Sequence, residues 1–258
     1  MKRKSFYQRN ETAIVGGISV IIVIAIWQIA WSAGKISPLF FSGPSAIAKR
    51  FADSYQHGTF LADLKFSGVN FAIGFLGAVV SGVILGVLIG WYRRLEMVLS
   101  PFLNALYATP RVAMVPLIII WFGIGMWSKV FIVYISAFFP VMINTIGGIK
   151  ATDGDLLRAA RAYCASDWQI FKTVAIPGAV PFILTGVRQG VALGLIGVVV
   201  GEMFGGSEGI GFMVAYGSQT FATDTTFVGV LTIAFAGIIL TWLAERLERR
   251  FSRWRPER

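Results

Sequence analysis

One arginine lies in the interior of an apolar segment, where a charged side chain is unusual. Arg111 follows Pro110 and precedes Pro116 in the stretch "TPRVAMVPLIIIWF". Ionisable groups inside a membrane are costly and usually face a bundle interior or a water-filled path. Two interpretations remain open. Arg111 bonds to carbonyls that the prolines leave free, or it attracts an anion in a pathway, because arginine suits carboxylate and sulfonate oxygens.

Other polar side chains in apolar segments extend this set. Glu202 is expected to pair structurally with Arg111 or Arg188, and the other interpretation is a gate residue. Three amide side chains are expected to bond across helices, which is a common way of joining them. The candidate residues of a translocation path are therefore Arg111, Asn104, Asn144, Gln189 and Glu202.

The residue types that carry most enzyme chemistry are nearly absent. His57 is the only histidine and lies in the polar stretch "YQHG", and Cys164 is the only cysteine. An internal disulfide is therefore impossible, and no metal site or nucleophile–base pair is suggested. The stretch "GIGMWSKV" lacks the second glycine and the final hydroxyl of a phosphate-binding P-loop. We therefore expect no catalytic residue, no metal and no cofactor in this chain.

The composition identifies the environment that must position these side chains. Of the 258 residues 56% are hydrophobic and only 14% are charged, whereas soluble domains carry roughly a quarter charged residues. The surplus apolar surface must face lipid, so the sequence predicts an all-α integral membrane protein. The net charge of +10 does not indicate nucleic-acid binding, because the basic residues cluster beside apolar spans and form no basic stripe on a soluble face.

Six apolar segments are each long enough to cross the membrane as a helix. The first is too long for the apolar part of a cleavable signal peptide, and the third is interrupted by polar residues and prolines. We find no internal repeat or linker and expect one domain over residues 1–258. The segments are Ala13–Ala33, Phe66–Tyr92, Pro101–Phe122, Lys129–Ile149, Pro181–Phe204 and Phe227–Ala244.

The distribution of lysine and arginine predicts the orientation. With the N-terminus in the cytoplasm, sixteen basic residues lie inside and five outside, while Arg111 and Arg188 fall within spans. The positive-inside rule therefore favours two cytoplasmic termini.

Small residues form stripes on two of the segments. Gly74, Ala78, Gly82, Gly86 and Gly90 recur every four residues, and glycines repeat in the same way between Gly186 and Gly205. Such stripes let helix backbones approach closely, so we expect tight packing inside a bundle in preference to a direct ligand role.

A charged segment at about residues 150–178 is predicted to be cytoplasmic and to form two short helices. Asp153 or Asp155 is expected to cap the first helix, and Ser166 with Gln169 gives the second a capping-box pattern. Pro177 is expected to end this second helix, and Pro181 to begin the next span. Trp168 and Phe171 give the segment an apolar side. The residues alone leave two interpretations open. The segment lies against its own helix bundle or on the lipid headgroups, or it is a docking element for a cytoplasmic partner.

This segment resembles the cytoplasmic EAA loop of permease subunits of binding-protein-dependent ABC importers. In "RAARAYCAS…VAIPGAVP", Ala159, Ala160 and Pro177 match that motif, whereas Arg158 replaces its glutamate and Cys164 its glycine. The stretches "TPRVAMVPLIIIWFGIGMWSK", "AFFPVMINTIGGI" and "GVVVGEMFGGSEGIGFMV" are similar to the nitrate/sulfonate/taurine branch of these permeases. The resemblance covers nearly the whole chain.

The resemblance implies a type I ABC importer permease fold with six transmembrane helices, in the bacterial inner membrane. It implies import of a small, anionic solute such as a sulfonate, taurine or nitrate. It also implies three kinds of partner: ATP-binding subunits that hold ATP and Mg, an extracytoplasmic substrate-binding protein, and a second permease subunit in a homodimer. The loop would couple this chain to the ATPase through Arg158, Ala159, Ala160, Cys164, Ser166, Trp168, Phe171 and Pro177.

Two other classes of membrane protein fit the sequence less well. An ion-coupled secondary transporter would need intramembrane acids near the midplane and usually an inverted repeat, and Glu202 alone is a poor candidate. A membrane scaffold without transport gives no reason for a capped loop or for Arg111.

Overall fold

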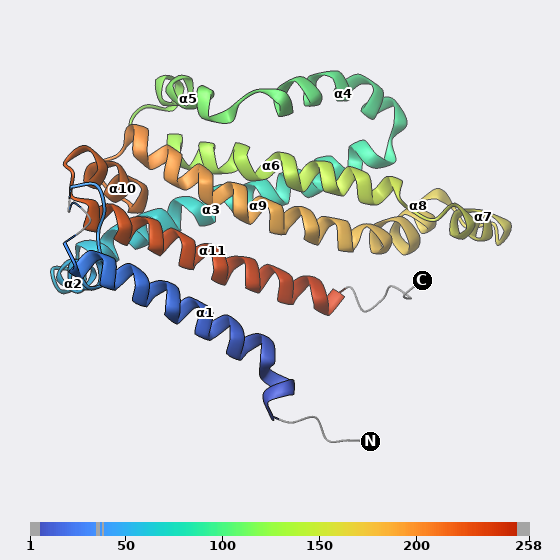
Figure 1. The fold of residues 1–258 in the computed structure, drawn as a ribbon. Coiled ribbons are helices and arrows are strands. Elements are labelled where there is room, and N and C mark those ends of the chain that lie inside the picture. The colour runs from blue at the N-terminus through green and yellow to red at the C-terminus, as the bar shows by residue number, and fades with distance from the viewer. Residues whose placement is uncertain (1–5, 35–36, 38, 252–258) are drawn as a thin grey trace. The chain divides into compact units, whose positions relative to one another are not determined.

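The computed structural model describes residues 6–34, 37 and 39–251, and its regular elements are helices throughout this part of the chain (Figure 1). Several basic residues used to predict the orientation lie outside the described residues, namely Lys2, Arg3, Lys4, Lys35, Arg253, Arg255 and Arg258. The helices are α1 (Phe6–Ser32), α2 (Pro44–Gln56), α3 (Thr59–Trp91), α4 (Arg93–Ala108), η1 (Arg111–Met114), α5 (Val115–Phe122), α6 (Met126–Lys150), α7 (Gly154–Ala162), α8 (Asp167–Ile170), η2 (Phe171–Ala175), α9 (Ile176–Gly205), α10 (Ile210–Gln219) and α11 (Thr223–Phe251).

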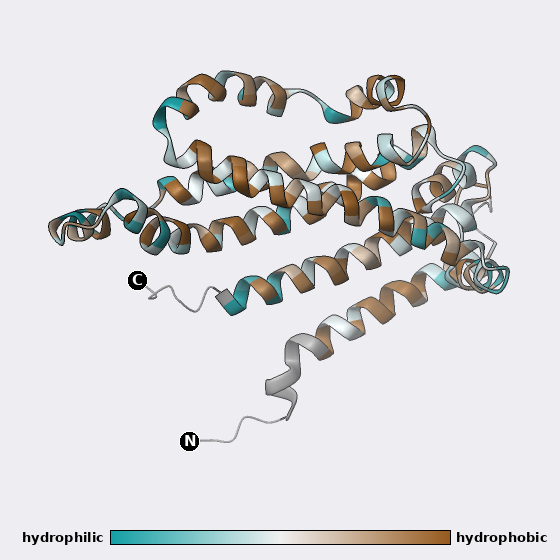
Figure 2. Ribbon diagram, turned by 180° about the vertical axis from the view of Figure 1, so that it is seen from behind, coloured by the Kyte–Doolittle hydropathy of each residue, from teal (hydrophilic) through white to brown (hydrophobic). Residues whose placement is uncertain are grey.

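Five helical runs are long and apolar enough to cross a membrane, and a sixth span is possible if a bent helix pair counts as one. The prediction of an all-helical membrane protein is therefore confirmed. Figure 2 shows that the long helices are mostly hydrophobic along their length. The five runs are Ile14–Ser32, Thr59–Trp91, Met126–Lys150, Asp167–Gly205 and Thr223–Arg250.

The chain divides into two compact units, and α3, α10 and α11 each have residues in both. The first unit contains the described residues of 1–61 and 213–231. In it, Trp27 of α1 packs its ring against Phe41 and against Phe227 of α11. The Nε of Arg50 on α2 donates a hydrogen bond of 2.9 Å to the hydroxyl of Thr225 on α11. Aromatic packing and this bond join the three helices within the unit.

The second unit contains the described residues of 62–212 and 232–258, and α6 is the most buried of its long helices. The predicted glycine stripes lie against this helix. A Cβ added at Gly86 of α3 would lie 2.6 Å from Cβ of Thr145, and one added at Gly197 of α9 would lie 2.9 Å from Oγ of Ser136. Only glycine permits such close approach of backbones, which confirms that the stripes serve helix packing. Figure 1 shows α3, α6 and α9 running side by side.

The third predicted segment is broken. Helices α4 and α5, with η1 between them, meet at an angle of 87° near Thr109 and Pro110. Thr109 has extended backbone angles, as is usual before proline, and Pro110 cannot donate the hydrogen bond that would continue α4. With eight residues, α5 is too short to span alone. The predicted segment Pro101–Phe122 is therefore not one straight helix.

The second loop helix continues into the membrane. The segment from Asp167 to Gly205 forms one helical run, in which a π-helical turn at Phe171–Ala175 precedes Pro177. The prediction that Pro177 ends the helix was wrong, and Pro181 lies inside α9 instead of beginning it. Proline lacks only one donor, and it lies in the first turn after the π-helical segment, where the altered bonding pattern accommodates it.

Candidate functional site

A cavity of about 430 Å³ lies where the break between α4 and α5 faces α6 and α9. Its walls come from the end of α4, η1, the first residue of α5 and the facing sides of α6 and α9. On α6 it reaches Ser136, which lies near the middle of that helix. Arg111 is the one charged residue among the described residues that line the cavity.

The guanidinium of Arg111 lies beside two aromatic rings that also contact each other. Its Cζ is 5.2 Å from the ring centre of Tyr107 on α4 and 5.5 Å from that of Phe139 on α6. A cation over ring faces at this distance is attracted to them, and arginine stacks well because it is weakly hydrated. The Nε atom is buried and has no hydrogen-bond partner among the described residues. The rings therefore hold the guanidinium without using its N–H groups.

Neither expected structural partner of Arg111 is found. Its side chain donates no hydrogen bond to a carbonyl freed by the prolines within the described residues, and Glu202 bonds elsewhere. The expected pairing of Glu202 with Arg111 or Arg188 was wrong. Glu202 accepts hydrogen bonds from other groups, Arg111 lies beside aromatic rings, and Arg188 pairs with glutamates of α11.

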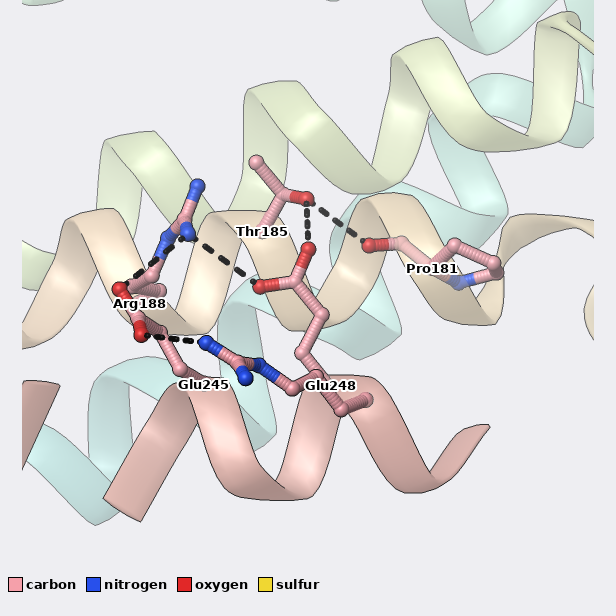
Figure 3. Close-up of polar contacts among 6 residues, drawn as sticks. Pro181, Thr185, Arg188, Glu245 and Glu248 are labelled. Carbon is pink, nitrogen blue, oxygen red and sulfur yellow. Dashed lines mark hydrogen bonds and ion pairs between the residues drawn. The ribbon is translucent and has the colours of Figure 1, made fainter. Parts of the chain in front are cut away.

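Arg188 of α9 belongs to an ionic network with α11 (Figure 3). Its Nη1 lies 3.6 Å from Glu248 and 3.8 Å from Glu245. Glu248 also accepts a hydrogen bond of 3.2 Å from Thr185, one turn earlier on α9. Glu245 also lies 3.5 Å from Arg249, so this one carboxylate is shared between an arginine of α9 and an arginine of α11. The network joins α9 to the last turns of α11.

Glu202 forms the centre of a buried polar cluster at the other end of α9. Its side chain is fully buried and accepts hydrogen bonds from Ser67 at 2.8 Å, from Asn70 at 3.4 Å and from the backbone N–H of Gly211 at 2.9 Å. Asp63 accepts a further bond of 2.8 Å from the N–H of Gly209. The cluster of Asp63, Ser67, Asn70 and Glu202 therefore holds the start of α10 to α3 and α9. A carboxylate is favourable at this helix N-terminus.

The sequence analysis missed the α3 members of this cluster. Asp63, Ser67 and Asn70 follow one another at spacings of four and three, so they lie on one face of α3. That polar face at the start of an otherwise apolar helix was a signal for a buried partner.

The three amide candidates lie outside the cavity. Asn144 on α6 donates a hydrogen bond of 3.0 Å to Gln189 on α9, which agrees with the expected bonding between helices. Asn104 is exposed on α4. Of the five candidate path residues, the cavity brings in only Arg111.

The loop after α6 is folded as two capped helices. Asp153 caps α7 by accepting a bond of 2.8 Å from the N–H of Asp155. Ser166 and Gln169 form both bonds of the capping box that the sequence predicts for α8. Arg158 pairs with Asp155 on the exposed surface of α7, and Ala159 is exposed beside it, with Ala160 half-buried.

Cys164 has the backbone conformation that favours glycine. Its φ is +57°, and the N–H groups of Cys164 and Ala165 bond to the carbonyls of Arg161 and Ala160. These are the two bonds of a Schellman motif, in which the residue at this position is usually glycine. Replacing the glycine of the EAA motif with Cys164 therefore loses the ease with which glycine adopts a positive φ.

Aromatic side chains connect the loop to the core of the second unit. Trp168 is 67% exposed and stacks on Phe171, with ring centres 5.4 Å apart. Phe171 in turn packs 4.9 Å from Trp91 at the end of α3. Sequence analysis did not identify Trp91. The exposed indole of Trp168 therefore packs on the ring of Phe171, which in turn packs on Trp91 of α3.

Comparison with protein families gives one match over most of the chain. The profile of the family described as "Binding-protein-dependent transport system inner membrane component" matches residues 79–253.

Several curated proteins are similar over nearly their whole length. The chain is 34% identical to the putative aliphatic sulfonates transport permease protein SsuC of Bacillus subtilis, covering 91% of this chain and 85% of that protein. It is 30% identical to the taurine transport system permease protein TauC of Escherichia coli, with 96% and 92% covered. It is 34% identical to the riboflavin transport system permease protein RibX of Chloroflexus aurantiacus, with 96% and 92% covered.

Solved structures share the fold. A chain of the MetNI methionine ABC transporter in an inward-facing conformation superposes with a TM-score of 0.65 at 17% sequence identity, covering 75% of this chain and 96% of that one. A chain of an amino acid ABC transporter gives a TM-score of 0.56 at 20% identity, with 79% and 97% covered.

Proposed function

Because this chain belongs to the family of binding-protein-dependent transport system inner membrane components, we propose that it is the permease of an ATP-driven importer for a small, anionic solute. It has the type I ABC importer permease fold and is not itself an ATPase. Membership of a binding-protein-dependent transport family implies an ATPase and a binding protein as partners. ATP and Mg are held by the ATPase subunits in this proposal.

The exposed aromatic end of a helical run carries the proposal of coupling. Trp168 lies on α8, and α8 continues without interruption through η2 into the span α9. An exposed tryptophan backed by other rings is a common anchor at protein interfaces. Residues Arg158, Ala159, Ala160, Cys164, Ser166, Trp168, Phe171 and Pro177 form the proposed coupling loop, which seats in the ATPase on the cytoplasmic side.

The anionic nature of the solute is supported by Arg111. Its guanidinium pairs with no carboxylate among the described residues, and the residue lines a cavity near the middle of α6. Asn104, Asn144, Gln189 and Glu202 remain proposed path or gate residues. The names of the relatives include sulfonate, taurine and riboflavin transport, so family membership does not fix the solute.

Two permease copies are proposed around one path. Five or six spans are few for an enclosed pathway, and a second copy of this chain would complete it. We place both termini in the cytoplasm, as the basic residues favour.

Uptake into proteoliposomes tests the proposal. The permease is reconstituted with its ATPase and binding protein, and uptake of labelled sulfonates, taurine and nitrate is measured. Uptake with ATP and Mg on the side of the membrane that carries the ATPase is compared with uptake when both are left out. ATP-dependent uptake of at least one anion is expected. Uptake driven by an ion gradient without ATP would support the secondary-transporter alternative and overturn the proposal.

A further inference from the structure

We propose that the cavity beside Arg111 is a recognition site inside the permease for an organic anion with a short aliphatic body, and that it discriminates against nitrate and taurine. This inference rests on the proposed import of small anions and narrows its substrate class. The permease itself, in addition to its binding protein, would then select the solute.

The first support is the unused charge of Arg111. In the described part of the chain no carboxylate lies within ion-pair distance of its guanidinium, and its Nε is buried without a partner. Arg188 provides the contrast, because its guanidinium is shared between Glu245 and Glu248 (Figure 3). A buried donor without a partner is costly. An oxyanion bound in the cavity would balance the charge of Arg111 through the part of its side chain that lines the cavity.

The second support is the fixed position of the guanidinium. The ring centres of Tyr107 on α4 and Phe139 on α6 lie 5.2 and 5.5 Å from its Cζ. Contact with the rings uses no N–H group of the guanidinium in a conventional hydrogen bond, so a guanidinium at this position can bind an anion through two parallel bonds. Sulfonate and carboxylate groups offer the pairs of oxygens that this arrangement requires.

The third support is the rest of the wall. Opposite elements contribute the aliphatic side chains of Ile132, Leu193, Ile196 and Val200. A volume of about 430 Å³ is within the usual range for small-molecule sites. Nitrate has no apolar part to bury against these side chains, whereas a short alkyl chain gains from leaving water.

The same wall disfavours an ammonium group. Among the described lining residues there is no aspartate or glutamate to balance a second, positive charge. The hydroxyls of Thr109 and Ser136 already donate to the carbonyls of Ala105 and Ile132, at 2.9 and 2.7 Å. Their remaining lone pairs provide weak compensation for a full charge. In taurine only two carbons separate the sulfonate from the ammonium, so the ammonium would also lie close to Arg111 and be repelled.

Binding to the permease without its binding protein tests the inference. The complex of permease and ATPase is placed in nanodiscs, and the affinities of labelled butanesulfonate, taurine and nitrate are measured. Butanesulfonate is expected to bind about tenfold or more tightly than either nitrate or taurine, because nitrate has no alkyl chain to bury and the cavity offers no counter-charge for the ammonium of taurine.

Four variants locate the site. Arg111→Ala is expected to weaken butanesulfonate binding about tenfold or more, because bonds to charged groups are among the strong ones. Arg111→Lys keeps the charge without the planar fork and should fall between Arg111→Ala and the wild type. Ile196→Trp narrows the cavity and should impair butanesulfonate more than ethanesulfonate. Arg94→Ala removes an exposed arginine of α4 outside the cavity and should change nothing.

Several results would overturn the inference while leaving the proposed function intact. These are equal affinity for taurine and butanesulfonate, or unaltered binding by both Arg111→Lys and Ile196→Trp, with ATP-dependent uptake of an anion by the wild type. Crosslinks showing that a second copy of the chain fills the cavity would also overturn it. Absence of ATP-dependent anion uptake by the wild type is a different result, since it removes the proposed function itself.

Discussion

Cys164 shows how one side chain can conflict with the backbone that it must adopt. It lies at the C-terminal cap of α7 with φ +57°, where a Cβ is crowded by the following carbonyl. The Schellman bonds to Arg161 and Ala160 keep it there. The loop therefore folds with a strained residue at this position, and a residue without a Cβ would make the folded loop more stable.

Replacing Cys164 with glycine should release that strain. We expect Cys164→Gly to stabilise the folded loop by about 0.5–1 kcal/mol, after allowance for the greater freedom of glycine in the unfolded chain. Hydrogen exchange of the amides at Cys164 and Ala165 would measure it as slower exchange. The control is Ala162→Gly within α7, which should speed exchange. Faster exchange in Cys164→Gly would contradict the assignment of strain.

Glu202 is expected to act through the backbone that it holds. Glu202→Ala would leave the N–H of Gly211 and the hydroxyl of Ser67 without their acceptor, at a cost of roughly 1–3 kcal/mol for a buried unsatisfied group. The melting temperature in detergent should fall, and exchange at Gly209–Gly211 should become faster. Glu208→Ala, an exposed acid in the same loop, should leave both measurements unchanged. An unaltered melting temperature in Glu202→Ala would show that water replaces the carboxylate at no cost.

At the scale of elements, the coupling loop depends on its aromatic rings. Trp168→Ala removes an exposed anchor, and Phe171→Ala removes the ring that joins it to Trp91. Either change should uncouple ATP hydrolysis from transport or release the ATPase, since truncated aromatic anchors cost roughly 2 kcal/mol or more at interfaces.

Co-purification of the ATPase, together with its hydrolysis rate per solute transported, would measure that effect. Trp121→Ala provides a matched control, because Trp121 is an exposed tryptophan on α5 and outside the loop. Normal assembly and transport by both Trp168→Ala and Phe171→Ala would show that the loop is not the docking element.

The sequence predicted the long elements well because length and apolar content alone define a membrane span. The capping box at Ser166 is also local, so both of its bonds could be predicted. The continuation of the helix through Pro177 could not, because it depends on a π-helical turn that no residue type specifies. The break near Thr109 was signalled by prolines, whereas its angle depends on packing.

The candidate site was predictable in part for the same reason. Arg111 was identified because a charge in an apolar segment is conspicuous. Its contact with Phe139 joins η1 to α6, and which sides of two helices face each other cannot be predicted from either segment alone. The pairing of Glu202 with an arginine was predicted from charge alone. Ser67, Asn70 and the N–H of Gly211 donate hydrogen bonds to this carboxylate instead, and the buried cation near it is Lys129.

At the scale of the whole molecule, the orientation in the membrane can be tested with its single cysteine. Cys164 is exposed in the loop, and a membrane-impermeant thiol reagent should not label it in intact cells but should after permeabilisation. In a Cys164→Gly background, a cysteine placed at Gln56, an exposed residue at the end of α2, should be labelled from outside. The opposite pattern would reverse the topology and place the loop on the wrong side for an ATPase.

The uninterrupted helix from Asp167 to Gly205 joins the exposed end of the loop to the buried polar cluster. Its 39 residues correspond to roughly 58 Å at the usual rise per residue. Close contacts with α6 follow α9 from Phe182, which lies against Gly148, to Gly201, which lies against Ile132. A displacement of Trp168 would therefore be carried along α9, on the surface of α6, towards the buried carboxylate that holds α10.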